Sequence, residues 1–258
     1  MRAVVCLLLV LLPGLAGAVL LPVIDTRPLA AEAELRLRME AGRIELRAGN
    51  EPQVRLEGEL APGTRLRWQE RVGGLALLIE TPARLRPSPA VLRLVVPSSA
   101  RLRLDVGDAE VLADGVGAGG LHLRGGRGDL QVQGGPGLRD LRIESTSGAI
   151  RIELPQAGRV RAESVAGRIE LRLGSAEGAE VRLESFTGPL ALHLPPGLPA
   201  RLRLRQAQGP LLLPEEARLR PDGDVDLGEG EGGGRITLQS FSGPVQVVAD
   251  PIVQRTNP

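Results

Sequence analysis

Apolar and polar residues alternate along most of this chain with a period of two, not with the 3.6-residue period of an amphipathic helix. The stretch around Gly148 shows the pattern, with apolar residues seven and five positions before the glycine and two and four positions after it. These residues are Leu141, Ile143, Ile150 and Ile152. The positions between them hold Arg and Glu. The pattern predicts two short β-strands on either side of the glycine, each with one buried and one solvent-facing side.

The same frame recurs along the chain at nearly constant intervals. Clear copies centre on Gly128, Gly148, Gly167, Gly188, Gly209 and Gly243, and looser copies centre on Gly42, Gly73 and Ala109. The five markers from Gly128 to Gly209 are separated by 20, 19, 21 and 21 residues. Such a period is the signature of repeat architectures, in which a unit cannot bury its apolar face alone and neighbouring units complete the core.

The repeat predicts an all-β fold, a single-stranded parallel β-solenoid whose coils of about 20 residues stack on their successors at about 4.8 Å. Between the two strands of a coil lies a Ser-x-x-Gly corner, where glycine can adopt positive φ and serine can hydrogen-bond the local backbone. The predicted corner residues are Ser145, Gly148, Ser164, Gly167, Ser185, Gly188, Gly209, Ser240 and Gly243. An antiparallel meander of hairpins is the alternative architecture, although it gains nothing from equally spaced identical corners.

Two interruptions predict how the chain is organised. Five prolines fall between residues 51 and 96, where the spacing of the markers doubles, so we expect residues 31–100 to form irregular β coils or a cap. Residues 101–250 are predicted to hold the regular repeats, followed by a tail at 251–258. Within them, residues 214–234 are rich in acid and glycine and poor in apolar residues, which is typical of an extruded loop.

The first 18 residues have the order of a secretory signal peptide. Arg2 precedes an apolar run, and the small residues Ala16, Gly17 and Ala18 offer a cleavage site. We therefore expect an exported protein, in the periplasm or at the cell surface, with residues 19–30 as a leader segment. The only cysteine, Cys6, lies inside the signal peptide, so no disulfide is expected in the mature chain.

Tandem Ser-x-x-Gly corners followed by alternating apolar residues, together with the segments Ala41–Leu46 and Val96–Leu102, resemble the bacterial "putative adhesin" domains of unknown function. They are also similar to the related heads of autotransporter adhesins. The resemblance covers about residues 31–250 and implies a right-handed β-helix-like fold in an exported protein, with no catalytic residues to transfer. Ala109 departs from the family pattern, because glycine is usual there.

The charge balance bears on the classes of partner. Without Arg2 the chain carries 31 basic and 31 acidic residues, so no general attraction to nucleic acid or to anionic lipid is expected. The outward charges look evenly distributed, and the chain has one tryptophan and two phenylalanines, which argues against a stacking platform for sugars or bases. A carbohydrate-active β-helix enzyme, a polysaccharide lyase or hydrolase, is the enzymatic alternative.

Few residues suggest a metal site. Asp222, Asp224 and Asp226 alternate like the start of a calcium loop, but Gly233 stands where the bidentate glutamate should be, so we expect a solvated loop. The two histidines, His122 and His193, lie far apart in outward positions and are interpreted as surface residues. Neither a cofactor nor a metal is expected, and a calcium-dependent adhesin stays as the second alternative.

The sequence therefore predicts a non-enzymatic envelope protein, an adhesin or a binding and scaffold module. Its outward Arg and Glu positions would contact a protein or a glycan at the cell envelope. We expect no nucleic acid partner and no membrane span after signal cleavage.

Overall fold

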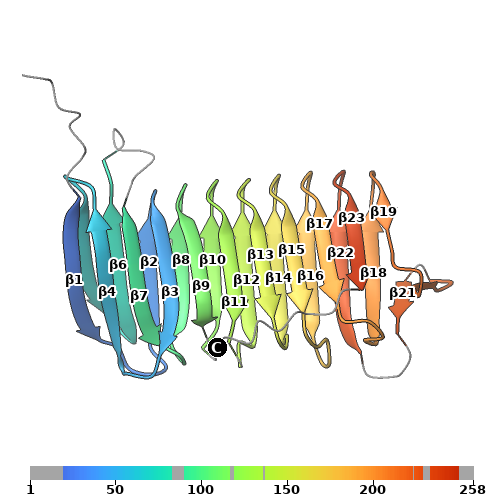
Figure 1. Cartoon of the computed structure of the whole chain (residues 1–258), viewed down its shortest axis with the longest axis horizontal. Helices are drawn as coiled ribbons and strands as arrows, with labels where there is room; N and C mark the ends of the chain where they lie inside the picture. Colours follow the sequence, from blue (N-terminus) through green and yellow to red (C-terminus); the bar gives the residue numbers. More distant parts are fainter. Residues whose placement is uncertain are drawn as a thin grey trace, which may run out of the picture.

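The computed structural model describes residues 20–82, 90–116, 119–135, 137–222, 224–228 and 233–249, and in these residues the secondary structure is entirely β. The strands form two large sheets that face each other and extend along one long axis (Figure 1). Residues 1–18, the predicted signal peptide, and the tail 251–258 lie outside the described residues. An all-β fold was predicted, and the prediction is confirmed.

Sheet A has 11 strands and sheet B has 12. In spatial order, sheet A contains β1 (Leu21–Pro28), β4 (Gln53–Leu60), β7 (Val91–Pro97), β3 (Arg43–Gly49), β9 (Glu110–Val116), β11 (Leu130–Gly134), β13 (Ile150–Leu154), β15 (Ile169–Leu173), β17 (Leu190–Leu194), β23 (Val245–Ala249) and β19 (Leu211–Leu212). In spatial order, sheet B contains β20 (Arg218–Leu219), β21 (Asp224–Leu227), β18 (Ala200–Gln206), β22 (Gly234–Ser240), β16 (Glu180–Ser185), β14 (Arg159–Ser164), β12 (Asp140–Ser145), β10 (Leu121–Gly125), β8 (Arg101–Val106), β2 (Glu34–Met39), β6 (Gly74–Glu80) and β5 (Arg65–Arg71).

Each repeat forms a two-strand unit with one strand in each sheet. In the unit at Gly148, β12 lies in sheet B and β13 in sheet A. Neighbouring units pair in parallel and in register, so that Ile150 lies opposite Ile169, and Ile169 opposite Leu190. The prediction of stacked parallel units is thus confirmed for the repeats, and the meander is wrong there; antiparallel pairs occur only toward the ends of the two sheets.

The apolar side chains that point inward from both sheets form one continuous core. Alternation within a strand produces it: in β13, Ile150 and Ile152 are buried while Arg151 and Glu153 are exposed. Full burial of one such aliphatic side chain contributes about 1.5–3 kcal/mol. Each unit supplies only a few of these side chains. It therefore needs a neighbouring unit on each side to shield them from water.

The spatial order of the units differs from their order along the chain at both ends. The unit β2–β3 pairs with β6–β7 on one side and with β8–β9 on the other, so the first repeat lies between two units that follow it in the sequence. Likewise β22–β23 lies between β16–β17 and β18–β19. The expectation that every unit stacks on its successor is wrong at these two places, because the aliphatic faces of different units fit one another interchangeably.

Several segments differ in form from the sequence-based expectation. Residues 21–28, within the predicted leader, form β1 and pair with β4 in the sheet. Gly73 was interpreted as a looser corner, but it lies at positive φ in the turn of the antiparallel hairpin β5–β6, within one sheet. The stretch 214–234, predicted as an extruded loop, contains β20 and β21, and β21 pairs with β18 through a buried Val225.

The corner glycines are required by close approach between units. Gly148, Gly167, Gly188 and Gly243 have no positive φ; of the predicted corner glycines only Gly209 does. A Cβ on Gly167 would lie well inside van der Waals contact with the carbonyl oxygen of Gly148, and a Cβ on Gly188 would meet that of Gly167. The expected role of backbone conformation is therefore replaced by a steric one. Ala109 keeps the register, because Gly128 lies against its carbonyl in the same way.

We predict that Gly167→Ala lowers the free energy of unfolding by about 1–3 kcal/mol, the usual cost of overpacking. The carbonyl of Gly148 cannot retreat without disturbing the hydrogen bond that it accepts from Ser145 Oγ. Urea denaturation of the purified chain measures the change.

Gly125→Ala is the matched control, since the atoms nearest to its Cβ belong to the side chain of Leu130 and not to the backbone. It should cost clearly less than Gly167→Ala. Equal losses in the two variants would contradict the steric explanation.

Candidate functional site

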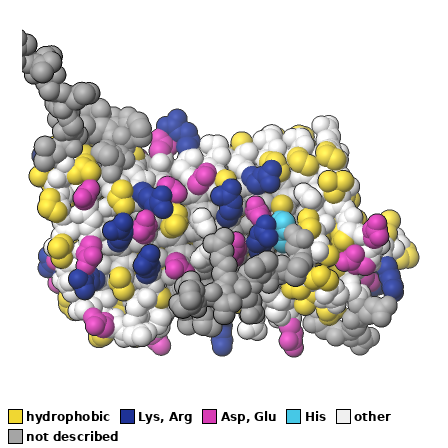
Figure 2. Space-filling model, viewed as in Figure 1, with side chains coloured by type: hydrophobic (Ala, Val, Ile, Leu, Met, Phe, Trp, Pro, Cys, Tyr) yellow, Lys and Arg dark blue, Asp and Glu magenta, His cyan; other side chains and the backbone are white. Residues whose placement is uncertain are grey.

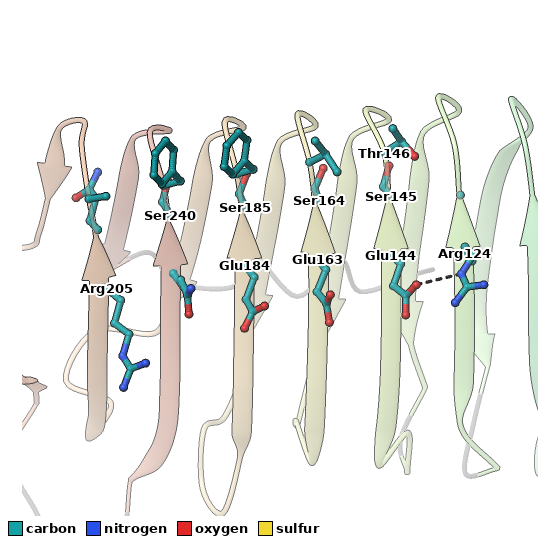
Figure 3. A pocket seen from close by; sticks show the side chains of 17 residues that line it. Arg124, Glu144, Ser145, Thr146, Glu163, Ser164, Glu184, Ser185, Arg205 and Ser240 are labelled. Atoms are coloured by element: carbon teal, nitrogen blue, oxygen red, sulfur yellow. Dashed lines mark hydrogen bonds and ion pairs between the residues drawn. The ribbon is translucent and has the colours of Figure 1, made fainter.

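Four strands of sheet B end in serines that form a column at one corner of the molecule. The residues are Ser145, Ser164, Ser185 and Ser240, and each lies opposite the next in the parallel register. Figure 3 shows them in one row. All four side chains are buried, so the column is part of the wall of the molecule and not a row of exposed hydroxyls.

Three of the four serine hydroxyls hold the corner turn, while Ser185 Oγ is buried without a hydrogen-bond partner among the described residues. Ser145 Oγ donates to the carbonyl of Gly148, and Ser240 Oγ donates to that of Gly243, both at 2.8 Å. Ser164 Oγ instead accepts from the backbone N–H of Gly167 at 2.8 Å. These bonds satisfy polar groups that the turn would otherwise leave unpaired, which gives the serines a structural role.

The residue that follows each serine points outward, and it is apolar after three of the four serines. Val165 and Phe186 are each 53% exposed and Phe241 is 49% exposed. The two phenyl rings stack face to face, with centroids 4.7 Å apart and planes 7° from parallel. We call Val165, Phe186 and Phe241 the apolar ridge. The phenylalanines are far apart in sequence and meet only because β22 lies directly on β16.

A row of carboxylates runs parallel to the serine column. Glu144, Glu163 and Glu184 lie opposite one another on neighbouring strands and stand side by side in Figure 3. Between this row and the apolar ridge lies a groove of about 820 Å³, with Arg124 at one end and Arg205 at the other. We call it the corner groove.

The carboxylates of the groove are held by arginines. Arg124 Nε lies 3.0 Å from Glu144 Oε2, and Arg142 Nη2 lies 2.7 Å from Glu144 Oε1. Partial burial raises the pKa of Glu144, but the hydrogen bonds and charges of the two arginines outweigh it and bring the pKa below the ordinary value of 4.5. Glu163 and Glu184 are paired in the same way with Arg161 and Arg182. Glu144 is therefore ionised at neutral pH and has no proton to donate.

The two histidines point outward, as predicted, but they are not freely solvated surface residues: their side chains are 29% and 14% exposed, and each is beside a glutamate. His122 Nε2 lies 3.7 Å from Glu144 Oε1, and His193 Nε2 lies 3.7 Å from Glu170 Oε1. Partial burial, followed by the charge of Arg103, lowers the pKa of His122 below its ordinary value of 6.5, so this imidazole is neutral at pH 7. The histidines lie in different sheets and do not form a common metal site.

The acidic residues Asp222, Asp224 and Asp226 are engaged by arginines. Arg203 Nε donates to Asp224 Oδ1 at 3.2 Å, and Arg220 Nη1 donates to Asp226 Oδ2 at 3.0 Å. Across the part of the chain that the structure describes, no group of three His, Cys, Asp or Glu side chains is arranged to hold a metal ion. The two glutamates that follow, Glu229 and Glu231, lie outside the described residues.

Sequence reasoning missed the apolar ridge. It noted that the chain has only two phenylalanines and inferred that no aromatic platform exists, whereas the fold brings both together on the surface. A signal was present, because the position after each corner serine reads Thr146, Val165, Phe186 and Phe241 in successive copies.

Comparison with known proteins gives distant structural likenesses. A solved structure described as a putative cell adhesion protein from Clostridium sporogenes has a TM-score of 0.37 and 10% identity, and the match covers 88% of this chain and 99% of that one. A putative adhesin from Bacteroides fragilis has a TM-score of 0.34 and 10% identity, covering 88% and 96%. No protein-family model and no curated protein matches the chain. Similarity at this level does not decide function, which has to follow from the geometry of the chain's own surface.

We predict that the pair between Arg203 and Asp224 makes stability depend on acid pH. The hydrogen bond from Arg203 lowers the pKa of Asp224 below 3.8, against the opposing effect of burial. A carboxyl whose pKa is lower in the folded state stabilises the fold above its unfolded pKa, and this contribution is lost as pH falls through the folded pKa. Asp224→Asn should therefore lower Tm at pH 7, with a difference from wild type that narrows below about pH 4.

Thermal unfolding followed by circular dichroism between pH 7 and pH 2 tests this. Asp114→Asn, which removes an exposed carboxylate from sheet A, should not reproduce the loss at pH 7. A difference in Tm between Asp224→Asn and the wild type that stays constant down to pH 2 would disprove the proposed pH dependence.

Proposed function

We propose that the protein is a β-solenoid that acts as a non-catalytic binding module of the cell envelope, in the manner of an adhesin, and contacts a protein or a glycan along the corner groove. Export by cleavage of residues 1–18, to the periplasm or the cell surface, is part of the proposal. The signal-like order of charge, apolar run and small residues supports it. No helix in the described residues is both long and apolar enough to cross a membrane.

The observation that carries the proposal is the apolar ridge. Two large aromatic side chains stay half exposed on the surface, beside a groove with polar walls. Aromatic side chains are enriched at the centres of interfaces, where burial of a single ring removes a large apolar area from water. An apolar strip with a polar rim is the arrangement that binding surfaces show.

The scaffold beneath the groove suits a binding role. The groove extends over several stacked strands, and the corner below it is fixed by serine hydrogen bonds and by glycines packed against carbonyl groups. A site on rigid strands loses little conformational entropy on binding. Its length favours an elongated partner over a small molecule.

We predict that the double variant Phe186→Ser with Phe241→Ser binds isolated cell envelopes of the encoding organism at least tenfold more weakly than the wild type. A tenfold loss corresponds to about 1.4 kcal/mol. Binding of the fluorescently labelled mature chain in a sedimentation assay measures it. The fold should persist with a modestly lower Tm, because a stacked pair contributes about 0.5–1.5 kcal/mol beyond burial.

Val72→Ser is the matched control, since Val72 is fully exposed in the turn between β5 and β6, away from the groove. It should bind like the wild type. Unchanged binding by the double phenylalanine variant would overturn the assignment of the groove. Shortening of a polysaccharide during incubation with the purified chain would overturn the non-catalytic function.

A further inference from the structure

The outer face of sheet B carries a straight row of arginines beside the corner groove. None of them lines the groove, but three are paired with the glutamates that do. Eight neighbouring strands of sheet B place the middle row of their outward side chains in register. In spatial order the row reads Arg36, Arg103, His122, Arg142, Arg161, Arg182, Thr237 and Arg203. We call its six arginines the arginine column. Neighbouring positions in the column are about 4.8 Å apart, the spacing of paired strands.

A row of like charges at this spacing has to be compensated, because like charges directly opposite on neighbouring strands destabilise a sheet. Acidic residues on the same strand or on a neighbouring one provide the compensation. Arg142, Arg161 and Arg182 each pair with the glutamate two residues further along the same strand. Arg36 pairs with Glu34, and Arg203 pairs with Asp224.

Within these pairs the guanidinium groups face the solvent more than the carboxylates do. The side chain of Arg182 is 49% exposed against 22% for Glu184, and that of Arg203 is 52% exposed against 10% for Asp224. The hydrogen bonds of Arg161 and Arg182 to their glutamates use Nε. A guanidinium has five N–H donors, so both Nη nitrogens of each arginine still carry donors for another acceptor.

The charge of the molecule is therefore divided unequally between its faces. The outward positions of the eight sheet B strands that carry the row, β2, β8, β10, β12, β14, β16, β22 and β18, hold thirteen arginines and seven acidic residues, a net charge of +6 with the histidine neutral. The eight facing strands of sheet A, β7, β3, β9, β11, β13, β15, β17 and β23, hold five of each. Figure 2 views the molecule from the side of sheet A, where positive and negative side chains are interspersed. The even distribution expected from the sequence is wrong for sheet B.

We propose that the arginine column binds a linear acidic polysaccharide, a polyuronate with one carboxylate per sugar, laid along the long axis of the molecule. Guanidinium groups bind carboxylates through two parallel hydrogen bonds, which gives both attraction and orientation. The glutamates beside the column hold the guanidinium groups in place before the ligand binds. This reduces the conformational entropy that the arginine side chains lose on binding.

The chemistry of the face favours a glycan over a nucleic acid. Its outward positions on the eight strands hold Arg, Asp, Glu, His, Thr and Gln, with no Phe, Tyr or Trp among them. Single-stranded nucleic acid takes much of its affinity from bases stacked on Phe, Tyr or Trp, whereas a polyuronate can bind through guanidinium–carboxylate pairs without any ring stacking. Because a polyuronate carries carboxylates along its whole length, one polymer can pair with several members of the column at once.

The proposal predicts that Arg142→Gln with Arg161→Gln and Arg182→Gln weakens binding of a fluorescein-labelled oligogalacturonate at least tenfold. Fluorescence anisotropy measures the affinity, and added salt should weaken the wild type more steeply than the triple variant. The matched control is Arg93→Gln with Arg151→Gln and Arg172→Gln, which removes three arginines, each in an ion pair, from sheet A. It should bind like the wild type.

A second variant separates specific pairing from overall charge and protects the test against misfolding. Arg161→Gln, Glu163→Gln, Arg182→Gln and Glu184→Gln together leave the net charge unchanged and leave no unpaired glutamate. This variant should also lose at least tenfold in affinity while keeping its Tm. Retained binding would overturn the proposal, and so would binding of single-stranded DNA as tight as that of the oligogalacturonate.

The double variant Phe186→Ser with Phe241→Ser should bind oligogalacturonate like the wild type, because the apolar ridge lies outside the column. Failure of the arginine column and failure of the corner groove are thus distinguishable. Loss of oligogalacturonate binding in the phenylalanine variant would overturn the assignment of this ligand to the column.

Discussion

The contact between one two-strand unit and the next governs this structure. At the corners from Gly128 to Gly188, and at Gly243, a glycine lies against the carbonyl of the corner residue in the neighbouring unit, with no room for a Cβ. This contact fixes the register of both strands that leave the corner, and therefore which side chains point inward. A slip of one residue would turn the whole aliphatic set outward. The straight rows of serines, carboxylates and arginines follow from the same constraint, because residues at the same place in the repeat must fall in line.

Much of this arrangement could be predicted from the sequence, because it is local to the repeat. The offsets of Leu141 and Ile150 from Gly148 predict the two strands, and their recurrence predicts parallel stacking. The order of the terminal units could not be predicted. Ile236 and Leu238 in β22 occupy the same frame positions as Leu202 and Leu204 in β18, so either strand fits against β16 and the pattern does not choose.

The two candidate surfaces were missed for different reasons. The apolar ridge depends on the unpredicted neighbour relation between β16 and β22, since Phe186 and Phe241 meet only there. The arginine column depends on the regular register alone and was visible at a fixed offset from each corner serine. It was overlooked because charge was averaged over the whole chain, where a neutral total conceals one positive face and one neutral face.

The position of β22–β23 inside the stack has a consequence for how the chain reaches its final form during synthesis. The strands β18 and β19 emerge from the ribosome earlier than the pair that separates them from β16 and β17. They cannot take their final places until that later pair arrives, or must release a provisional pairing to admit it. A chain interrupted before residue 234 would lack an interior layer, leaving a gap flanked by two unmatched backbone edges. Completion of synthesis and closure of the fold are thereby coupled.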